Sequence, residues 1–296
     1  MILCIGQSAY DITYVIHEDL IENQKYRIYE TMECVGAPAT NAASLCAKWQ
    51  EDSALISRVG NDLYGEKILQ TLRAQGVDTR FIKELEDFKT PVSTIIAHAE
   101  NGSRTIFNCP GELHPCEFQY PSSCDVILLD GHEMEASLEA LTRFPDAISV
   151  LDAGTCKEET RLLGAMVDHL VCSQDFARQY SGITIDKENP QSVVDTFVSL
   201  RKLNKKQIVV TLGEDGLLYG KGDEIIHLPA FKVKALDTTG AGDIFHGAYA
   251  YGVMKKWDME KILKVASATA ALSTEKLGGN VAIPALEDVE KMIKKE

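Results

Sequence analysis

The stretch DTTGAGD, residues 237–243, places two carboxylates, two hydroxyls and three very small residues immediately before a predicted helix. The first N–H groups of a helix have no partner within the helix, and they carry about half a positive charge. Small residues at such a place let an anion approach the backbone closely, which is how helix N-termini bind phosphate groups. The loop therefore predicts an anion-binding site.

Asp243, at the predicted start of the helix, is the residue of this loop that is suited to acid–base chemistry. As a simple N-cap it would accept a backbone N–H, and the loop would then be only a turn. A turn requires one glycine, however, whereas small residues fill positions 240–242. A carboxylate beside a bound anion also needs its own task, such as accepting a proton from an attacking alcohol. Spacing alone leaves the capped turn and the anion site as alternatives.

The elements that must position this loop follow an alternating pattern. Apolar β-type runs occur at residues 1–5, 53–60, 125–130, 147–154, 170–173 and 207–213. Helix-period segments occur at residues 39–50, 63–76, 134–144, 156–169, 174–180, 189–204, 243–256, 258–276 and 285–294. Near-continuous apolar strands separated by helices predict an α/β fold, with a mostly parallel sheet sandwiched by helices.

Two segments interrupt this pattern. Residues 12–34 alternate apolar and polar side chains, and residues 91–108 form two β runs around Asn101-Gly102, a strong hairpin signal. We expect the two segments to pair as a small β-sheet lid over a core made of residues 1–11, 35–90 and 109–296. Two independent surface hairpins are the alternative.

Length and composition narrow the class of protein. The chain of 296 residues fits one large α/β domain with a modest appendage, and its net charge of −14 disfavours nucleic acid or an anionic membrane as a partner. The eight cysteines form no C-x-x-C pair, the first residues lack a basic leader, and no run approaches a membrane span. We expect a cytoplasmic protein with reduced thiols.

The segment DTTGAGDIFHGAY, residues 237–249, resembles the C-terminal signature of the ribokinase-like (PfkB) family of sugar and nucleoside kinases. Further motifs resemble those of the family in the same order along the chain. They are IGQSAYD at 5–11, GAPATNAA at 36–43, TLGEDG at 211–216 and STEKLGGNVAIP at 273–284. In motif detail the chain is most similar to the ketohexokinase- and fructokinase-like sugar kinases of this family.

The resemblance implies an ATP-dependent phosphotransferase that uses Mg²⁺. Asp243 would be the general base, and the N–H groups of Gly240, Ala241, Gly242 and Asp243 would form an anion hole for the phosphoryl group. A monovalent cation such as K⁺ would be held by Asp237 and Thr239, with oxygens from the loop around Gly279.

The resemblance also divides the remaining positions between two substrates. The residues implied for the sugar are Asp11, Gly36, Asn41, Arg104 and Asp243, and Asp130 is added to them because of its position in the sequence. The residues implied for the nucleotide are Ser173, Thr211, Gly213, Gly216, Gly240, Gly242, Gly279 and Asn280. Asp130 also ends an apolar strand, where ligand contacts gather in open α/β sheets. For Arg104, spacing alone leaves an exposed hairpin arginine as the alternative.

The chain departs from the family pattern at two places. Ala37 stands where the family usually has a second glycine, which narrows the approach of the backbone to the sugar. The magnesium-linked N-x-x-E motif is replaced by Ser173 and Phe176, with Asp175 as a candidate substitute. We interpret the second change as a mark of the subfamily.

The sequence therefore predicts a kinase that phosphorylates a hydroxyl, expected to be primary, of a small sugar such as a ketohexose or ribose. A nucleoside kinase, a phosphosugar kinase and a non-catalytic sugar- or nucleotide-binding regulator are the alternatives. Exposed strand edges on the lid invite pairing with a second copy, so we expect a homodimer.

Overall fold

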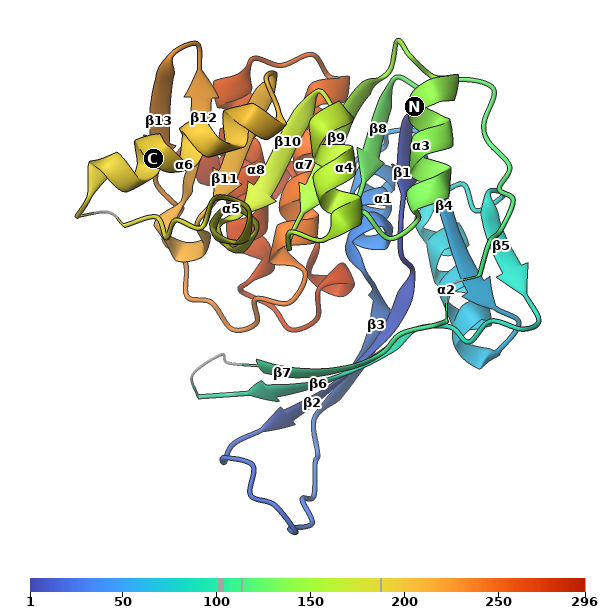
Figure 1. Ribbon diagram of the computed structural model, residues 1–296. Helices are drawn as coiled ribbons and strands as arrows, with labels where there is room; N and C mark the ends of the chain where they lie inside the picture. The colour runs from blue at the N-terminus through green and yellow to red at the C-terminus, as the bar shows by residue number, and fades with distance from the viewer. Residues whose placement is uncertain (101–103, 113, 187, 296) are drawn as a thin grey trace.

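The computed structural model describes residues 1–100, 104–112, 114–186 and 188–295 (Figure 1). The turn predicted at Asn101-Gly102 lies outside these residues. None of the helices described is both long enough and apolar enough to cross a membrane.

The larger sheet runs in the order β13-β12-β11-β10-β9-β8-β1-β4-β5. Its strands are β1 (Ile2–Ile5), β4 (Ser53–Gly60), β5 (Ile82–Leu85), β8 (Val126–Leu129), β9 (Ile148–Ala153), β10 (His169–Ser173), β11 (Gln207–Thr211), β12 (Leu217–Lys221) and β13 (Glu224–Leu228). The strands from β11 to β5 are parallel, and β12 and β13 add an antiparallel edge. The predicted mostly parallel sheet is confirmed, whereas the edge strands β5, β12 and β13 were not predicted.

Helices cover both faces of this sheet (Figure 1). One face carries α1 (Pro38–Lys48), α2 (Leu63–Gln75), α7 (Ala241–Met254), α8 (Met259–Ser273) and α9 (Leu286–Ile293). The other carries α3 (Met134–Arg143), α4 (Glu158–Met166), α5 (Gln174–Ser181) and α6 (Pro190–Leu203). Because side chains alternate along a strand, Ile2 and Cys4 of β1 join the first core, and Leu3 and Ile5 join the second.

Local sequence explains where α2 begins and ends. The carboxylate of Asp62 accepts the N–H groups of Tyr64 and Gly65, which have no partner within the helix. At the other end Gly76 has φ 88°, a left-handed conformation that glycine adopts without steric cost. The predicted end of this helix at Gly76 is confirmed.

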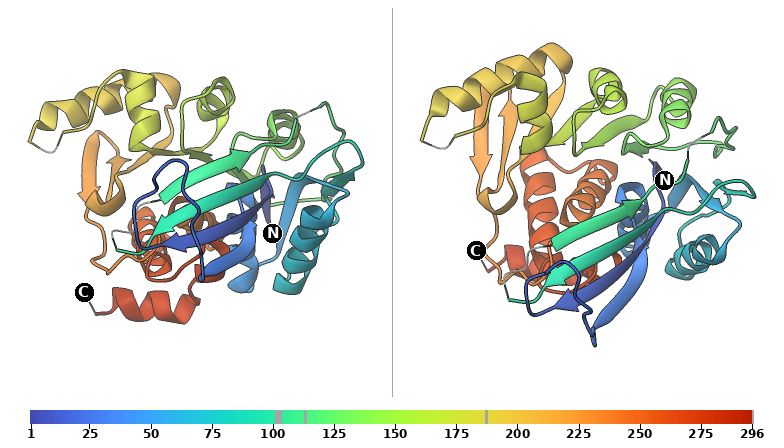
Figure 2. Two further views of the ribbon diagram at one scale, coloured as in Figure 1. Left: turned by 90° about the horizontal axis from the view of Figure 1, so that it is seen from below. Right: turned by 60° about the horizontal axis from the view of Figure 1, so that its bottom comes forward.

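The smaller sheet runs in the order β3-β2-β6-β7 and projects from one end of the larger sheet (Figures 1 and 2). Its strands are β2 (Ala9–Ile16), β3 (Thr31–Gly36), β6 (Val92–His98) and β7 (Arg104–Cys109). Strand β2 pairs with β6 in parallel, so the two inserted segments form one sheet and not two separate hairpins.

The small sheet differs in extent from the segments predicted for it. It begins at Ala9 and reaches Gly36, so it includes residues on both sides of 12–34, while no strand is found over residues 17–30. The reason is that only three residues separate the end of β1 from the start of β2, so the chain enters the small sheet directly. The predicted boundary between core and lid stays a prediction.

The crossing of α1 over α7 is unusually close. A Cβ atom added at Gly247 would lie 2.9 Å from the Cα and 3.2 Å from the carbonyl oxygen of Ala42. Only a glycine permits this approach of α7 to the backbone of α1, because any side chain would collide with main-chain atoms that cannot rotate away. The contact brings the first turns of both helices together.

We expect Gly247→Ala to lower the free energy of unfolding by about 1–2 kcal/mol. Overpacking costs ~1–3 kcal/mol, and the better helix propensity of alanine offsets up to ~1 kcal/mol. Gly154→Ala is the matched control, because a Cβ atom there would meet nothing within 4 Å. Urea unfolding of both variants checks this, and equal stability of the two variants would contradict the close crossing.

Candidate active site

The loop 237–243 turns sharply into α7. Gly240 is the N-cap, with φ 71°, and the helix begins at Ala241. The N–H of Ala241 bonds to the carbonyl oxygen of Thr238 at 3.3 Å, while the N–H groups that follow belong to the first helical turn. A Cβ atom at Gly242 would meet nothing within 4 Å, so the space over the helix start is open.

Asp243 is the third residue of α7 and does not cap it, contrary to the capped turn considered from the sequence. The reason is that the turn at Gly240 already starts the helix three residues earlier. One oxygen of Asp243 instead accepts a hydrogen bond of 2.8 Å from the side-chain amide of Asn41, in the first turn of α1. Two residues predicted from separate motifs are therefore in direct contact.

A chain of amides orients Asn41. Its carbonyl Oδ1 accepts from Nδ2 of Asn280 at 3.1 Å, and Oδ1 of Asn280 accepts from Nε2 of Gln75 at 2.7 Å. Because its Oδ1 is occupied in this way, Asn41 presents its Nδ2 to Asp243. Asn280 is 3% exposed and serves this chain, and its predicted contact with a nucleotide stays a prediction.

Asp11 lies within β2 of the small sheet, although residues 1–11 were assigned to the core from the sequence. Asp11 is 8% exposed, and this burial raises the pKa of its carboxyl group. A hydrogen bond with the side chain of Ser93 favours the ionised form and so acts in the opposite direction. A Cβ atom at Gly36 would lie 2.0 Å from the Asp11 carboxylate, so a glycine is required where β3 passes Asp11. The next residue, Ala37, has φ 82°, a strained conformation for alanine at the position where the family usually has glycine.

Asp130 directly follows β8, and its carboxylate connects three segments near the ends of the strands. Its carboxylate accepts backbone N–H groups of Gln7 at 2.9 Å, Ala39 at 3.2 Å and His132 at 2.9 Å. Its side chain is 1% exposed. Both oxygens thus accept backbone N–H groups, and the predicted contact of Asp130 with a sugar stays a prediction.

Three of the residues predicted for the nucleotide, Ser173, Thr211 and Gly213, lie at the ends of β10 and β11. Ser173 and Thr211 are partners in the parallel ladder. The hydroxyl of Ser173 donates to Gly154 and accepts the N–H of Phe176, so it caps α5. After β11, Gly213 has φ 63°, and a Cβ atom there would meet nothing within 4 Å.

Gly216 serves the fold at the next turn. It has φ 89°, and a Cβ atom there would lie 2.1 Å from the carbonyl oxygen of Leu228. A glycine is therefore required where β12 begins next to the end of β13. The role of Gly216 in nucleotide binding stays a prediction.

Asp237 and Thr239 form the first part of the loop 237–243, where Asp237 bonds to the segment that contains Gly279. Asp237 is 5% exposed, and its carboxylate accepts the N–H groups of Thr239 at 2.9 Å and Gly278 at 2.8 Å. Among the described residues, the buried Oγ1 of Thr239 has no hydrogen-bond partner. A carboxylate and a free hydroxyl oxygen are ligands that suit a hard cation.

Arg104 is the first residue of β7 and reaches from the small sheet to the loop. Its Nη1 donates to the hydroxyl of Thr238. This contact places a guanidinium group next to the proposed anion site, and the predicted role of Arg104 in sugar binding stays a prediction.

Two buried residues in the site were not predicted. Asp152 is the last residue but one of β9 and is 9% exposed, and its Oδ2 lies 3.1 Å from Nδ1 of His246, one helical turn after Asp243. A signal for Asp152 exists, because it closes an apolar strand in VLD as Asp130 does in LLD. No comparable signal marks His246.

The pKa of Asp243 is raised to about 7, chiefly because burial disfavours the charged form of its carboxyl group. The hydrogen bond from Asn41 favours the charged form and opposes the shift. A carboxyl that titrates near neutral pH is suited to act as a general base.

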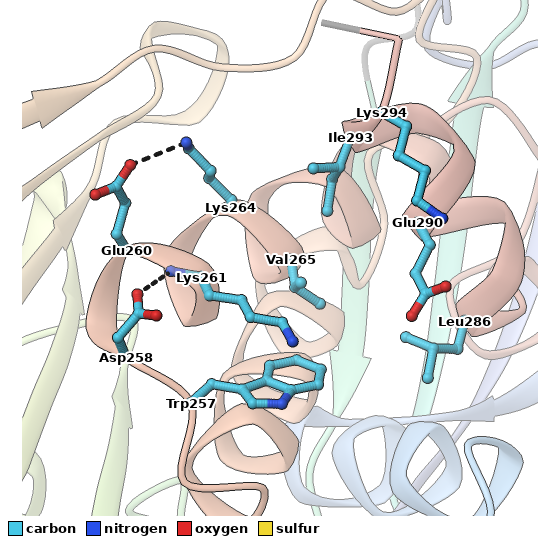
Figure 3. A pocket seen from close by; sticks show the side chains of 10 residues that line it. All are labelled: Trp257, Asp258, Glu260, Lys261, Lys264, Val265, Leu286, Glu290, Ile293 and Lys294. Carbon is cyan, nitrogen blue, oxygen red and sulfur yellow. Dashed lines mark hydrogen bonds and ion pairs between the residues drawn. The ribbon is translucent and has the colours of Figure 1, made fainter.

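A separate hollow of about 550 Å³ lies between α8 and α9 (Figure 3). In Figure 3, Lys261 extends over the ring of Trp257, with Nζ 4.0 Å from the ring centroid. Leu286 and Ile293 line the opposite side. No residue predicted for the site lines this hollow, so it is distinct from the candidate active site.

Comparison with known proteins identifies the class. The model of the pfkB family of carbohydrate kinases matches residues 1–286. The chain therefore belongs to the PfkB family, and the predicted ribokinase-like fold is confirmed. No relative described below is a ketohexokinase, so the finer resemblance to that branch stays a prediction.

Three individual proteins illustrate the similarity. The chain is 26% identical to a ribokinase of Staphylococcus aureus over 268 residues, which cover 87% of each chain. It is 27% identical to a deoxyribokinase of Salmonella typhi over 313 residues, 99% of this chain and 98% of that one. A solved structure from Agrobacterium tumefaciens, described as a proposed ribokinase, superposes with a TM-score of 0.89 at 25% identity and covers 99% and 97% of the two chains.

We expect Asp243→Asn to stabilise the protein at pH 8 by about 1–3 kcal/mol and to leave its stability unchanged near pH 4. The unfolded chain loses this proton near the ordinary value of 3.8, whereas the folded protein keeps it to about pH 7. Ionisation of Asp243 therefore costs stability as the pH rises between these values, and asparagine removes that cost.

Urea unfolding at both pH values measures this effect. Asp223→Asn, an exposed carboxylate in the turn between β12 and β13, is the control and should change neither value. A gain for Asp243→Asn that is equal at pH 4 and pH 8 would contradict the raised pKa.

Proposed function

We propose that the protein transfers the γ-phosphoryl group of ATP to a hydroxyl group of a small uncharged sugar, such as a ketohexose or ribose. The observation that carries this proposal is the placement of Asp243 in the first turn of α7, in contact with Asn41. The candidate base Asp243 then lies in the first turn of α7, next to the open N-terminus of that helix, and the amide of Asn41 on α1 contacts it.

The loop fits a phosphoryl group. The space over Gly242 is open, and the N–H groups from Gly240 to Asp243 lie at the positive end of the helix. When bound, ATP with Mg²⁺ supplies the phosphoryl group and neutralises part of its charge. This chain contributes the donors that would stabilise the oxygens of the phosphoryl group as charge spreads over them.

The positions of the missing N-x-x-E motif do not fit a magnesium-linked carboxylate. Phe176 is fully buried, and the hydroxyl of Ser173 is engaged in capping α5. Asp175, the candidate substitute, pairs with Arg178 at 3.1 Å. We infer that Mg²⁺ would be held mainly through water and the phosphates of the nucleotide.

A monovalent cation fits beneath the loop. The Thr239 hydroxyl oxygen has no partner among the described residues, and the Asp237 carboxylate lies next to it in the chain and bonds to the N–H of Thr239. A cation bound there would support the loop from behind, and K⁺ is the candidate.

The acid–base step would belong to Asp243. With a pKa of about 7, its carboxylate can accept the proton of an attacking hydroxyl group at neutral pH. The amide of Asn41 binds one oxygen, so the other oxygen is left for the hydroxyl group. The hydrogen bond from Asn41 thus orients the carboxylate, while burial raises its pKa into the range needed for a general base.

The acceptor side is acidic. The charge of Asp11 contributes to the raised pKa of Asp243, and this pair of carboxyl groups disfavours an acceptor that already carries a phosphate or carboxylate. The names of the relatives, ribokinase and deoxyribokinase, point to uncharged pentoses as their acceptors. We therefore favour a neutral sugar over a phosphosugar.

The small sheet would act as a lid. It holds Asp11 on β2 and Arg104 on β7, and Arg104 already contacts Thr238 of the anion loop. Closure of such a sheet would exclude water and suppress hydrolysis of ATP. Ile106 and Phe107 on β7 are 48% and 56% exposed, which suits the predicted homodimer through this sheet.

We expect turnover of a ketohexose or ribose when Mg-ATP, K⁺ and a panel of sugars, nucleosides and phosphosugars are tested for release of ADP. Asp243→Asn should reduce kcat by about 10²–10⁴-fold, because general-base catalysis contributes about that much. Asp223→Asn is the control and should retain full turnover.

Two outcomes would overturn this proposal. Near-full turnover by Asp243→Asn would contradict the assignment of Asp243 as the general base. Ligand-induced stabilisation without ADP release across the whole panel would indicate a non-catalytic binding protein.

We also expect Arg104→Ala to lower kcat/KM by about tenfold or more, because a hydrogen bond to a charged group contributes ~1.5–3 kcal/mol. The loss should shrink at high salt, where charge attraction is screened. Arg143→Ala is the control, since Arg143 is a surface residue of α3 paired with Glu139. An unchanged kcat/KM for Arg104→Ala would place this arginine outside the reaction.

A further inference from the structure

His246 is a buried histidine that joins three elements. It lies on α7 and is 4% exposed. Its Nδ1 lies 2.6 Å from the carbonyl oxygen of Gly242 and 3.1 Å from Oδ2 of Asp152 in β9. Its Nε2 lies 3.1 Å from the carbonyl oxygen of Val171 in β10. The ring thus ties the first turn of α7 to two strands of the sheet.

The partners of this ring restrict where protons can be. Carbonyl oxygens only accept hydrogen bonds, so Nε2 must carry a proton to bond with Val171. On the other side, a neutral ring next to an ionised Asp152 would place a lone pair against two acceptor oxygens, an uncompensated contact in a buried place. One further proton is therefore needed, either on Nδ1 of His246 or on the carboxyl group of Asp152.

We propose that Asp152 and His246 form a positioning pair for Asp243, which holds one shared proton and stays uncharged beneath the start of α7. This proposal rests on the proposed function, because it assigns the pair to the base of that reaction. The pair anchors the first helical turn without adding a second carboxylate charge at the site. Neither location of the shared proton changes the net charge of the pair.

The surrounding groups support this assignment. Burial raises the pKa of Asp152 to about 8, with a contribution from the charge of Asp130, and burial lowers the pKa of His246. His132 also faces Asp152 and favours its charged form, while Asp11 acts on Asp243 from the small sheet. Asp130 acts on Asp152, and Asp243 acts on His246, and both carboxyl groups favour retention of the proton by the pair at neutral pH.

The proposal has a consequence at alkaline pH. Above about pH 8 the pair loses its proton, and a negative charge appears next to Asp243 and the anion loop. That charge repels the phosphoryl group, because like charges in a poorly solvated site interact strongly. Phosphoryl transfer should then fall as the pair ionises.

The kcat of the wild-type protein should fall up to tenfold per pH unit above about pH 8, as for a single ionisation. The asparagine side chain in Asp152→Asn cannot ionise, so the kcat of this variant should stay constant between pH 7.5 and pH 9.5. Asp168→Asn is the matched control, because Asp168 lies just before β10, at the opposite end of the sheet, where it bonds to Ser149 and Lys206. Its alkaline decrease should match the wild type.

A merely structural role for Asp152 would lower kcat or stability at every pH and leave the alkaline decrease in place. Retention of that decrease in Asp152→Asn would therefore overturn the proposal. So would a wild-type kcat that does not fall above pH 8.

A second measurement does not depend on turnover or on the folding of a variant. NMR of the wild-type protein without ligands, labelled with ¹⁵N in histidine and ¹³C in aspartate, reports the protonation of both groups. We expect one shared proton at pH 7. An ionised Asp152 next to a neutral His246 at that pH would overturn the pair, whereas a lack of phosphotransfer to any acceptor would overturn only the proposed function.

Discussion

The close crossing of α1 over α7 is the constraint on which the site depends. Gly247 lets the two backbones approach, and the first turns of both helices then meet. The amide of Asn41 reaches Asp243 at 2.8 Å although 202 positions separate them in the chain. Asn280 completes the arrangement by orienting the amide of Asn41. A packing contact between two helices thus becomes the geometry of a base and its orienting group.

The site also concentrates acidic groups, and each is managed by a different device. Backbone N–H groups surround Asp130, a hydrogen bond from Ser93 favours the ionised form of Asp11, and the amide of Asn41 binds Asp243. Asp152 is left with an imidazole partner. Gathering carboxylates in a buried place costs stability, and it is also the reason why one of them titrates near neutral pH.

Much of the fold follows from local pattern. Apolar strands such as β8 and β9 and capped helices such as α2 are visible in the sequence, because their side chains are buried on both faces of a sheet or on one face of a helix. The short edge strands β5 and β13 lack such a pattern, since much of their surface is exposed. The pairing of β2 with β6 joins distant segments, and no local signal specifies that it is parallel.

The sequence by itself determined the family, the presence of a helix after the DTTGAGD loop and the residue types at the site, because these depend on motifs of adjacent residues. Only the tertiary structure decided what those residues contact. In the structure Asp130 accepts hydrogen bonds from backbone N–H groups, and Asp11 lies in the small sheet. His246 of α7 contacts Asp152 of β9. Hydrogen-bond partners and burial arise from segments far apart in the chain, and these set the pKa values that no local pattern contains.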